Sequence, residues 1–424
     1  MDIRLAYGKT GLEVTLPDKA HVTIVEPTYV NGRPTPLAAI HQALREPIGS
    51  PPLRSLVAPD DRVGIAFSDI TRPTPNHIIL PTLLDHLSHV SPDHITLFNG
   101  TGTHRTNTDE ELRRMVGDHV AERYRIVQND ARDQDAHCLV GNTTTGNAIW
   151  LHREFVDCDV RILTGFIEPH FFAGFSGGGK ALMPGLARLD TVLRNHSAEH
   201  MDNPKARWGI REGNPLWEEI REAVQLVPPT FLLNVTLNRD HEITGIFAGD
   251  WEEAHARGCA FVRDVSMVGL ESPFDIVITS NSGYPLDLNL YQAVKGMSAA
   301  AQIVRQGGSI ILASDCWDGI PEHGDYGRLL CEADDLEDLL ETVRDPGFSQ
   351  QDSWQAHTQA LVCQRADVYL FTHNLTAQQI KDALLIPCSD VASTVEELLR
   401  RHGPDARVCV LPEGPQTIPY IARG

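Results

Sequence analysis

Short apolar runs alternate with longer amphipathic segments along most of this chain, and this alternation limits the folds that it can adopt. The runs are bounded by turn residues, as is typical of strands buried in a sheet. Between several of them, apolar residues recur at helical spacing, as in residues 77–90, 110–124 and 214–227. The pattern predicts an α/β fold. The expected strands are residues 61–67, 94–100, 124–130, 160–166, 230–237, 274–280, 308–314, 366–372 and 406–412.

The length of the chain, 424 residues, favours two domains over one. Gly, Ser and Pro interrupt the pattern at residues 268–275, between a helical segment and the next strand. We therefore expect an N-terminal α/β domain over residues 1–270 and a C-terminal α/β domain over residues 271–411. The tail, residues 412–424, is too short to fold alone and is expected to pack back on the N-terminal domain.

Composition excludes several classes of function. A net charge of −21 disfavours binding to nucleic acid or to an anionic membrane, because both need clustered Lys and Arg. The eight cysteines show no paired spacing of a zinc site and are expected to be reduced thiols, mostly buried. The N-terminus lacks the basic and apolar stretches of a signal peptide, and no run approaches the ~18 apolar residues of a membrane span. A cytoplasmic location is predicted.

In open α/β sheets, ligands bind beyond the carboxyl ends of the strands, so the loops there are the first place to look for chemistry. Asp69 and Arg72 follow the first long strand, in a turn that contains two prolines. They can bind the hydroxyl groups and a negatively charged group of a ligand, or they can form a local pair that caps the next helix. His104 follows the second strand on a glycine-rich turn, where a functional role is favoured over a structural one.

The segment from Gly165 to Gly185, GFIEPHFFAGFSGGGKALMPG, carries both a histidine and a lysine. His170 lies beside aromatic residues that exclude water, which suits an acid or a base. The glycines at 174, 177, 178 and 179 let a ligand approach the backbone, and successive N–H groups of such a loop can converge on an anion near Lys180.

A phosphate loop is the obvious alternative for this segment, since Gly174, Gly179 and Lys180 match G-x-x-x-x-G-K. Ala181 then stands where the hydroxyl that binds magnesium should be, which disfavours a nucleotidase. A non-catalytic phosphate or nucleotide binder stays open as the alternative function.

Two further groups complete the candidate residues. His196 and His200 are four residues apart and would share a face of a helix, where they could chelate one metal, and His196 is favoured as the chemical one. Tyr291, Gln292 and Lys295 lie at the start of a helix expected after residues 274–280. A helix N-terminus with a lysine and an amide suits a carboxylate, although an ordinary surface lysine is the simpler interpretation.

The segments SDITRPTP, GTGTHR, GFIEPHFFAGFSGGGKALMPG, NHS and NLYQAVKG occur in this order over residues 68–296. Together they closely resemble motifs of the lactate racemase family, which uses a nickel-pincer nucleotide. The resemblance implies two α/β domains with a cofactor cleft between them. It also implies an isomerase: a racemase or epimerase of lactate or a larger 2-hydroxy acid.

The resemblance assigns roles to the cofactor residues. Lys180 matches the lysine joined covalently to the cofactor, pyridinium-3,5-bisthiocarboxylic acid mononucleotide nickel, and His196 matches the histidine that completes the nickel coordination. Asp69 and Arg72 match residues that hold the cofactor and orient the substrate. Ser176, Gly177 and Gly178 are further expected cofactor contacts. Gly179 departs from the pattern, since family members often carry Arg there.

The resemblance also implies the reaction. His104 and His170 match an acid–base pair on opposite sides of the substrate, and Tyr291, Gln292 and Lys295 match the group near the substrate carboxylate, which Arg72 also helps to hold. One histidine takes the hydroxyl proton as hydride moves reversibly from the carbinol carbon to the pyridinium ring, leaving a planar 2-oxo acid. The expected partners are a small 2-hydroxy acid and the enzymes that make the cofactor.

Overall fold

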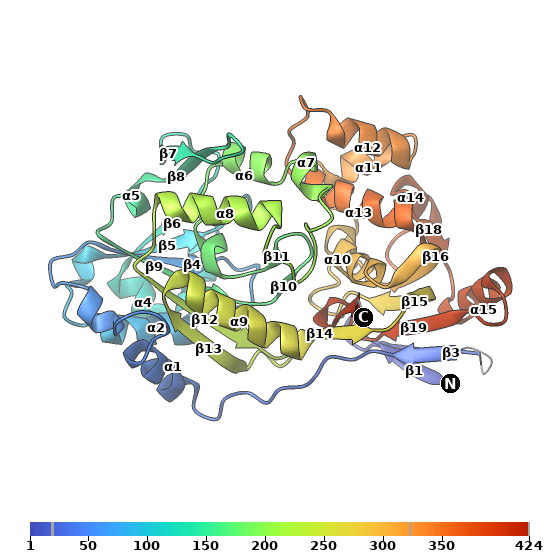
Figure 1. Ribbon diagram of the computed structural model, residues 1–424, viewed down its shortest axis with the longest axis horizontal. Helices are drawn as coiled ribbons and strands as arrows, with labels where there is room; N and C mark the ends of the chain where they lie inside the picture. The colour runs from blue at the N-terminus through green and yellow to red at the C-terminus, as the bar shows by residue number, and fades with distance from the viewer. Residues whose placement is uncertain (18–20, 322–323, 423–424) are drawn as a thin grey trace. The chain divides into compact units, whose positions relative to one another are not determined.

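The computed structural model describes residues 1–17, 21–321 and 324–422, and it confirms the α/β class (Figure 1). The chain forms two compact units. Unit 1 comprises residues Met1–Thr28, Ser197–Asp202 and Ser266–Gly424, and unit 2 comprises Tyr29–His196 and Asn203–Val265. Each unit is built around its own six-stranded sheet.

The sheet of unit 2 has the order β13-β12-β9-β4-β5-β6 and is parallel except for β13, which runs antiparallel to β12. Its strands are buried on both faces, which explains their continuous apolar sequences. Along β4, for example, Ile65 and Phe67 join one core cluster, and Ala66 joins the cluster on the opposite face. The strands are β4 (Val63–Ser68), β5 (Ile95–Gly100), β6 (Arg125–Gln128), β9 (Val160–Phe166), β12 (Phe231–Leu237) and β13 (Ile243–Gly249).

Helices, 3₁₀ turns and two hairpins connect these strands. The segment expected as one helix over 110–124 is two, because Gly117 has a φ of 85° between them. The helices are α1 (Pro36–Arg45), α2 (Asn76–His86), α3 (Asp109–Val116), α4 (Asp118–Arg123), α5 (Arg153–Val156), α6 (Leu189–Asn195), α8 (Pro215–Leu226) and α9 (Trp251–Ser266). The 3₁₀ turns are η1 (Leu53–Leu56), η2 (Pro92–His94) and η3 (Gly178–Ala181), and the hairpins are β7 (His137–Asn142) with β8 (Ala148–His152) and β10 (Pro169–His170) with β11 (Gly174–Phe175).

The sheet of unit 1 is fully parallel, in the order β18-β17-β16-β15-β19-β3. Its strands are β3 (His21–Ile24), β15 (Phe274–Ser280), β16 (Val304–Ala313), β17 (Ala366–Phe371), β18 (Ile386–Cys388) and β19 (Arg407–Leu411). Its helices are α7 (Ala198–Met201), α10 (Leu290–Ala301), α11 (Tyr326–Glu332), α12 (Leu336–Arg344), α13 (Ser353–Arg365), α14 (Ala377–Asp382) and α15 (Val391–His402). Smaller elements are β1 (Asp2–Leu5), β2 (Leu12–Thr15), β14 (Met267–Leu270), η4 (Gly414–Gln416) and β20 (Ile418–Ile421).

The compact units differ from the predicted division at residue 270. The first 28 residues belong with the C-terminal half, because β3 pairs with β19. The tail pairs through β20 with β14, and the backbone of Gly414 lies against Ser280, all within unit 1. The segment Ser197–Asp202 also belongs to unit 1.

Asp202 anchors this segment. Its carboxylate accepts hydrogen bonds from Nε and Nη2 of Arg344, at 2.8 and 2.9 Å, and pairs with the buried ring of His357 at 2.9 Å. Burial opposes ionisation of Asp202, but its partners His357 and Arg344 lower its pKa overall, well below the usual value. The charged form of Asp202 is therefore the one that holds α7 on α12 and α13.

The cysteines and the helices can be compared with the expectations drawn from composition. All eight cysteines are free thiols, and burial raises the pKa of several of them, including Cys259 and Cys409, to about 12. Among the described residues, no helix combines the length and the apolar character that a membrane span requires.

Candidate active site

The loops after β4 and β5 bring Asp69 and His104 together. These strands are parallel neighbours, so their carboxyl ends meet at one edge of the sheet. The Nδ1 atom of His104 lies 2.8 Å from Oδ2 of Asp69, and Asp69 is 3% exposed while the ring of His104 is partly exposed. A local pair of Asp69 with Arg72 was one of the two interpretations left open by the sequence, and the side chain paired with Asp69 is that of His104. Arg72 contributes instead through its positive charge and through its backbone N–H, which donates to the Asp69 carbonyl at 3.2 Å.

The Asp69 carboxylate fixes the tautomer of His104. Burial opposes ionisation of Asp69, but the hydrogen bond and the charge of His104, together with the charge of Arg72, lower its pKa overall. An ionised carboxylate can only accept, so Nδ1 of His104 donates to it. In the neutral ring, Nε2 then carries the lone pair, which is the arrangement of a general base.

His170 and Lys180 meet at the phenyl ring of Phe172. The Nε2 atom of His170 lies 3.3 Å from Nζ of Lys180, and that Nζ lies 5.6 Å from the centre of the Phe172 ring. The ring of His170 stacks on Phe171 and meets Phe172 edge-on, with centroids 4.9 and 4.5 Å apart. The backbone N–H of Ala173 donates to Nδ1 of His170 at 3.3 Å. Donors therefore face both ring nitrogens of His170, the N–H of Ala173 at Nδ1 and the amine of Lys180 at Nε2, whereas His104 has a carboxylate at Nδ1.

His196 reaches the same phenyl ring from the end of α6. Its ring meets Phe172 edge-on at 5.0 Å between centroids, and it is 7% exposed. Its Nδ1 atom donates to the carbonyl of Val192 at 3.1 Å, so Nε2 carries the lone pair in the neutral ring. This is the tautomer of a metal-binding histidine whose second nitrogen is held by the backbone.

The prediction that His196 and His200 share a helix face is wrong. The helix α6 ends at Asn195, His196 caps it, and a new helix, α7, begins at Ala198. The two histidines belong to different compact units. The described residues contain no cluster of three or more His, Cys, Asp or Glu side chains that could hold a metal by itself.

The glycine-rich loop is packed against protein. A Cβ on Gly178 would lie 2.6 Å from the ring of His255, and one on Gly177 would lie 2.7 Å from Oδ1 of Asn234. The N–H of Gly178 donates to that same Oδ1 at 2.7 Å, and the N–H of Ser176 donates to the carbonyl of Glu168 at 2.9 Å. The expected convergence of these N–H groups on an anion is therefore wrong for Ser176 and Gly178. These two donors are already used by hydrogen bonds within the protein.

The residues that hold this loop were not found from the sequence. Asn234 comes from β12 and His255 from α9, and His255 donates from Nε2 to the carbonyl of Ser176 at 2.9 Å. Complete burial lowers the pKa of His255 to about 3, with help from the charge of Arg211. Neither residue lies near a motif, so no local signal could have identified them. Phe172 was noted only as a neighbour of His170.

The second-domain candidates lie on α10 in unit 1. The helix begins as predicted: the side chain of Asn289 caps it by accepting the N–H of Gln292 at 3.1 Å. Tyr291 donates its hydroxyl to Asp352 at 3.2 Å. Gln292 and Lys295 are half-buried, three residues apart on this first turn. The structure thus presents an amide and an amine near a helix N-terminus.

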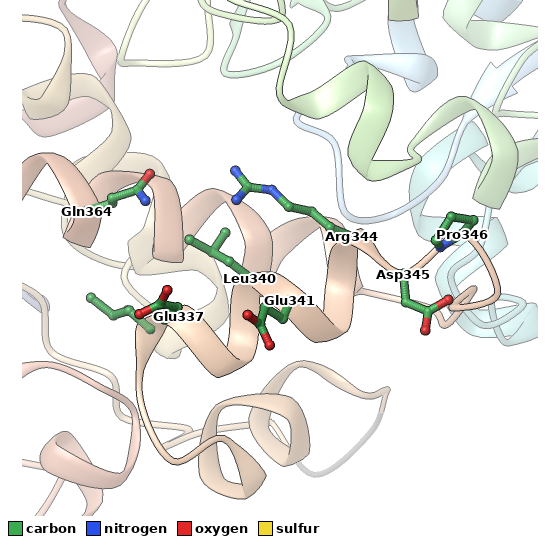
Figure 2. Close-up of a pocket in the computed structure, with 8 residues that line it drawn as sticks. Glu337, Leu340, Glu341, Arg344, Asp345, Pro346 and Gln364 are labelled. Atoms are coloured by element: carbon green, nitrogen blue, oxygen red, sulfur yellow. The ribbon is translucent and has the colours of Figure 1, made fainter.

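The groove with a volume of about 800 Å³ in Figure 2 is a separate feature of unit 1. It follows the charged surface of α12 and contains none of the candidate residues. The residues that line it are Leu336, Glu337, Leu340, Glu341, Arg344, Asp345, Pro346 and Gln364.

Comparisons with known proteins cover almost the whole chain. A family model described as the lactate racemase N-terminal domain matches residues 7–209, and one described as the lactate racemase C-terminal domain matches residues 270–418. The lactate racemase of Thermoanaerobacterium thermosaccharolyticum is 35% identical over 424 residues, which cover 98% of this chain and 99% of the relative. The lactate racemase of Lactiplantibacillus plantarum is 34% identical over 416 residues, covering 97% and 98%.

A solved structure agrees with these sequence matches. The apoprotein of the lactate racemase from Thermoanaerobacterium thermosaccharolyticum superposes with a TM-score of 0.92 at 33% identity, covering 99% of this chain and 100% of that one. The similarity therefore extends to the fold of both halves of the chain.

Proposed function

We propose that this chain, which belongs to the lactate racemase family and is an isomerase, interconverts the enantiomers or epimers of a 2-hydroxy acid with a nickel-pincer nucleotide bound at Lys180. Lactate is the first substrate to test, because both curated relatives are named lactate racemases. A larger 2-hydroxy acid is the broader possibility within the same reaction.

The residues around Phe172 fit such a cofactor. Lys180 supplies an amine for covalent attachment, and His196 supplies a neutral imidazole with its lone pair on Nε2, a donor well suited to nickel. The nickel would need further ligands, because His196 is the only histidine proposed to bind it, and soft sulfur atoms of the nucleotide would provide them. Reversible acceptance of a hydride is the chemistry that the cofactor supplies when bound.

The protein's own part in the reaction is to hold and move protons. With its proton on Nδ1, His104 accepts the substrate hydroxyl proton at Nε2 as the carbinol carbon is oxidised. When it is protonated, His170 donates to the carbonyl oxygen as the opposite enantiomer forms, and it is left as a neutral imidazole. The pair is thus set for one direction of the reaction, and exchanging the two protonation states sets it for the other.

We further propose that charged and polar groups hold the substrate carboxylate during this exchange. Lys295, Gln292 and Tyr291 of α10 supply an ammonium, an amide and a hydroxyl close to a helix N-terminus. Arg72 supplies a guanidinium after β4. The phenyl rings of Phe171 and Phe172 exclude water from His170.

One observation supports this function above the others: Lys180, His170 and His196 meet at one phenyl ring. A non-catalytic phosphate or nucleotide binder explains Lys180 alone. It is also disfavoured by the internal hydrogen bonds of the loop at Ser176 and Gly178.

The first test is the substitution Lys180→Ala in protein produced together with the cofactor-making enzymes. We expect the wild-type protein to carry a nucleotide adduct by intact mass and to racemise lactate or another 2-hydroxy acid. Lys180→Ala should lose the adduct, the nickel and the activity together, since no other amine replaces Nζ. Lys205→Ala, at an exposed lysine of the same unit, is the matched control and should keep all three. An unmodified Lys180 in active wild-type protein would disprove the proposal.

A further inference from the structure

Glu219 of α8 is a buried carboxylate that the proposed reaction does not use. It is 1% exposed, and its hydrogen-bond donors in the described structure are uncharged. Burying a carboxylate is costly unless its oxygens are fully hydrogen-bonded. A residue with this cost is expected to contribute something that an apolar side chain could not.

The donors to Glu219 come from two separate parts of unit 2. On one oxygen, Oε1, it accepts the hydroxyls of Thr143, at 3.2 Å, and Thr145. On the other, Oε2, it accepts the amides of Asn147 at 3.0 Å and Asn195 at 2.8 Å. The first three donors lie at the turn between β7 and β8, and Asn195 is the last residue of α6. One carboxylate on α8 therefore ties the hairpin and the end of α6 together.

The end of α6 is also the place from which His196 projects. A hydrogen bond from Nδ1 of His196 to the carbonyl of Val192, one helical turn earlier, holds the ring against this end of the helix. The middle of α6 is fixed separately, because Thr191 donates to Ala148 and accepts from the N–H of Trp150. Any shift of the last turn of α6 would therefore move the ring nitrogen Nε2 of His196.

We propose that Glu219 is a positioning residue for His196: through Asn195 it fixes the last turn of α6 so that Nε2 is held where nickel binds. This inference rests on the nickel role of His196 in the proposed function. A carboxylate suits the task because its two oxygens accept four hydrogen bonds at once, and bonds to an ionised acceptor are stronger than neutral ones. Mutation of an outer residue that orients a metal ligand commonly lowers the affinity for the metal by about 10- to 100-fold.

The decisive variant is Asn195→Ala, which removes the direct bond from α6 to Glu219 and leaves the other three donors in place. It also removes the weaker bond of the same amide to the carbonyl of Leu216, at 3.3 Å, so Glu219→Ala, which keeps that bond, is measured beside it. The readout is the nickel content per Lys180 adduct during titration with a chelator, with the adduct counted by intact mass. We expect the adduct to stay, because attachment at Lys180 does not involve His196. The chelator concentration that removes half of the nickel should fall about tenfold or more. Glu219→Ala should act in the same direction.

Two control variants separate positioning from general stability. Glu219→Gln should keep most of the nickel, because its carbonyl can accept the two amides while its NH₂ group donates to the threonine hydroxyls, which can reverse their roles. Glu222→Ala removes a neighbouring carboxylate of α8 that binds the N–H and hydroxyl of Thr144 in the same hairpin turn but does not reach α6. It should lower the unfolding midpoint without changing nickel per adduct.

The outcomes distinguish this inference from the proposed function. If wild-type protein carries no adduct, the proposed function fails. If it carries adduct and nickel, and folded Asn195→Ala releases nickel at the wild-type chelator concentration, the positioning role of Glu219 is disproved. Should Glu219→Ala fail to fold, Asn195→Ala still decides, since it removes a single amide and no charge.

Discussion

The hydrogen bond between Asp69 and His104 determines which ring nitrogen can act on a substrate. A carboxylate at Nδ1 places the proton there and leaves Nε2 as a base. At His170, a backbone N–H faces Nδ1, and the amine of Lys180 faces Nε2. The two imidazoles are therefore chemically different although they are the same residue type, and the difference comes from their partners.

Asp69→Asn should abolish this arrangement of the His104 ring while leaving the attachment point at Lys180 intact. The amide can donate to Nδ1, which favours the tautomer with the proton on Nε2, so His104 can no longer act as a base. We expect the turnover number, per protein carrying the Lys180 adduct and nickel, to fall roughly 10²-fold or more, the usual contribution of general acid–base catalysis. Steady-state racemisation kinetics measure this, and the double variant Asp69→Asn with His104→Gln should lose little more than either single variant. A fully active Asp69→Asn enzyme would contradict the assignment.

His255 should make the protein less stable in acid. Its pKa is lowered to about 3 by burial, whereas an unfolded chain has a histidine pKa of about 6.5. Between these pH values the unfolded state binds the extra proton, so the free energy of unfolding decreases as the pH falls, by up to about 1.4 kcal/mol per pH unit.

His255→Gln should reduce this acid sensitivity, because glutamine cannot titrate but still offers an N–H to the carbonyl of Ser176. Urea unfolding at pH 7 and at pH 5 measures the effect. The difference between the two pH values should be smaller in His255→Gln than in the wild type, and unchanged in His94→Gln, an exposed control. Equal differences in wild type and His255→Gln would show that another group is responsible.

At the scale of elements, the glycine-rich loop depends on tight packing against β12 and α9. Gly178 has a φ of 57°, and a Cβ there would lie 2.6 Å from the ring of His255. Gly146, in the turn between β7 and β8, also has a positive φ of 82° but has open space around it. An alanine at Gly146 would therefore carry only the cost of a positive φ, whereas an alanine at Gly178 would also clash with the ring of His255.

Gly178→Ala should therefore be clearly more harmful than Gly146→Ala. Alanine in the left-handed region costs about 1–2 kcal/mol at either site, and at Gly178 the ring of His255 must also shift. We expect a lower unfolding midpoint and reduced adduct formation at Lys180 in Gly178→Ala, measured by thermal unfolding and intact mass. If both variants lose the same stability, packing against His255 contributes nothing beyond the backbone preference.

The sequence allowed the central strands to be predicted because they are buried on both faces, which leaves continuous apolar runs at β4, β9 and β15. The hairpin of β7 and β8 was missed because its partly exposed strands have mixed composition. The break after α6 was missed because the sequence there shows no proline or glycine. Candidate residues next to strand ends could be predicted from topology, but the partners of His255, Asn234 and Glu219 are far apart along the chain and required the structure.

At the scale of the whole molecule, unit 2 lies within the sequence of unit 1. The chain leaves unit 1 after Thr28 and returns to it for good at Ser266, apart from the segment Ser197–Asp202. Each unit nonetheless has its own α/β core, with clusters of apolar side chains on both faces of its sheet. The first residues of the chain are thus part of the half that carries Tyr291 and Lys295.

The pairing of β3 with β19 has a consequence for how the molecule is made. Residues 21–24 leave the ribosome long before the strand beside which they lie, Arg407–Leu411. At about 5–20 residues per second, the amino-terminal strand waits tens of seconds for its neighbour. All of unit 2 precedes β19 in the sequence, so it can fold while the sheet of unit 1 still lacks this strand, and in the interval residues 21–24 are available to chaperones.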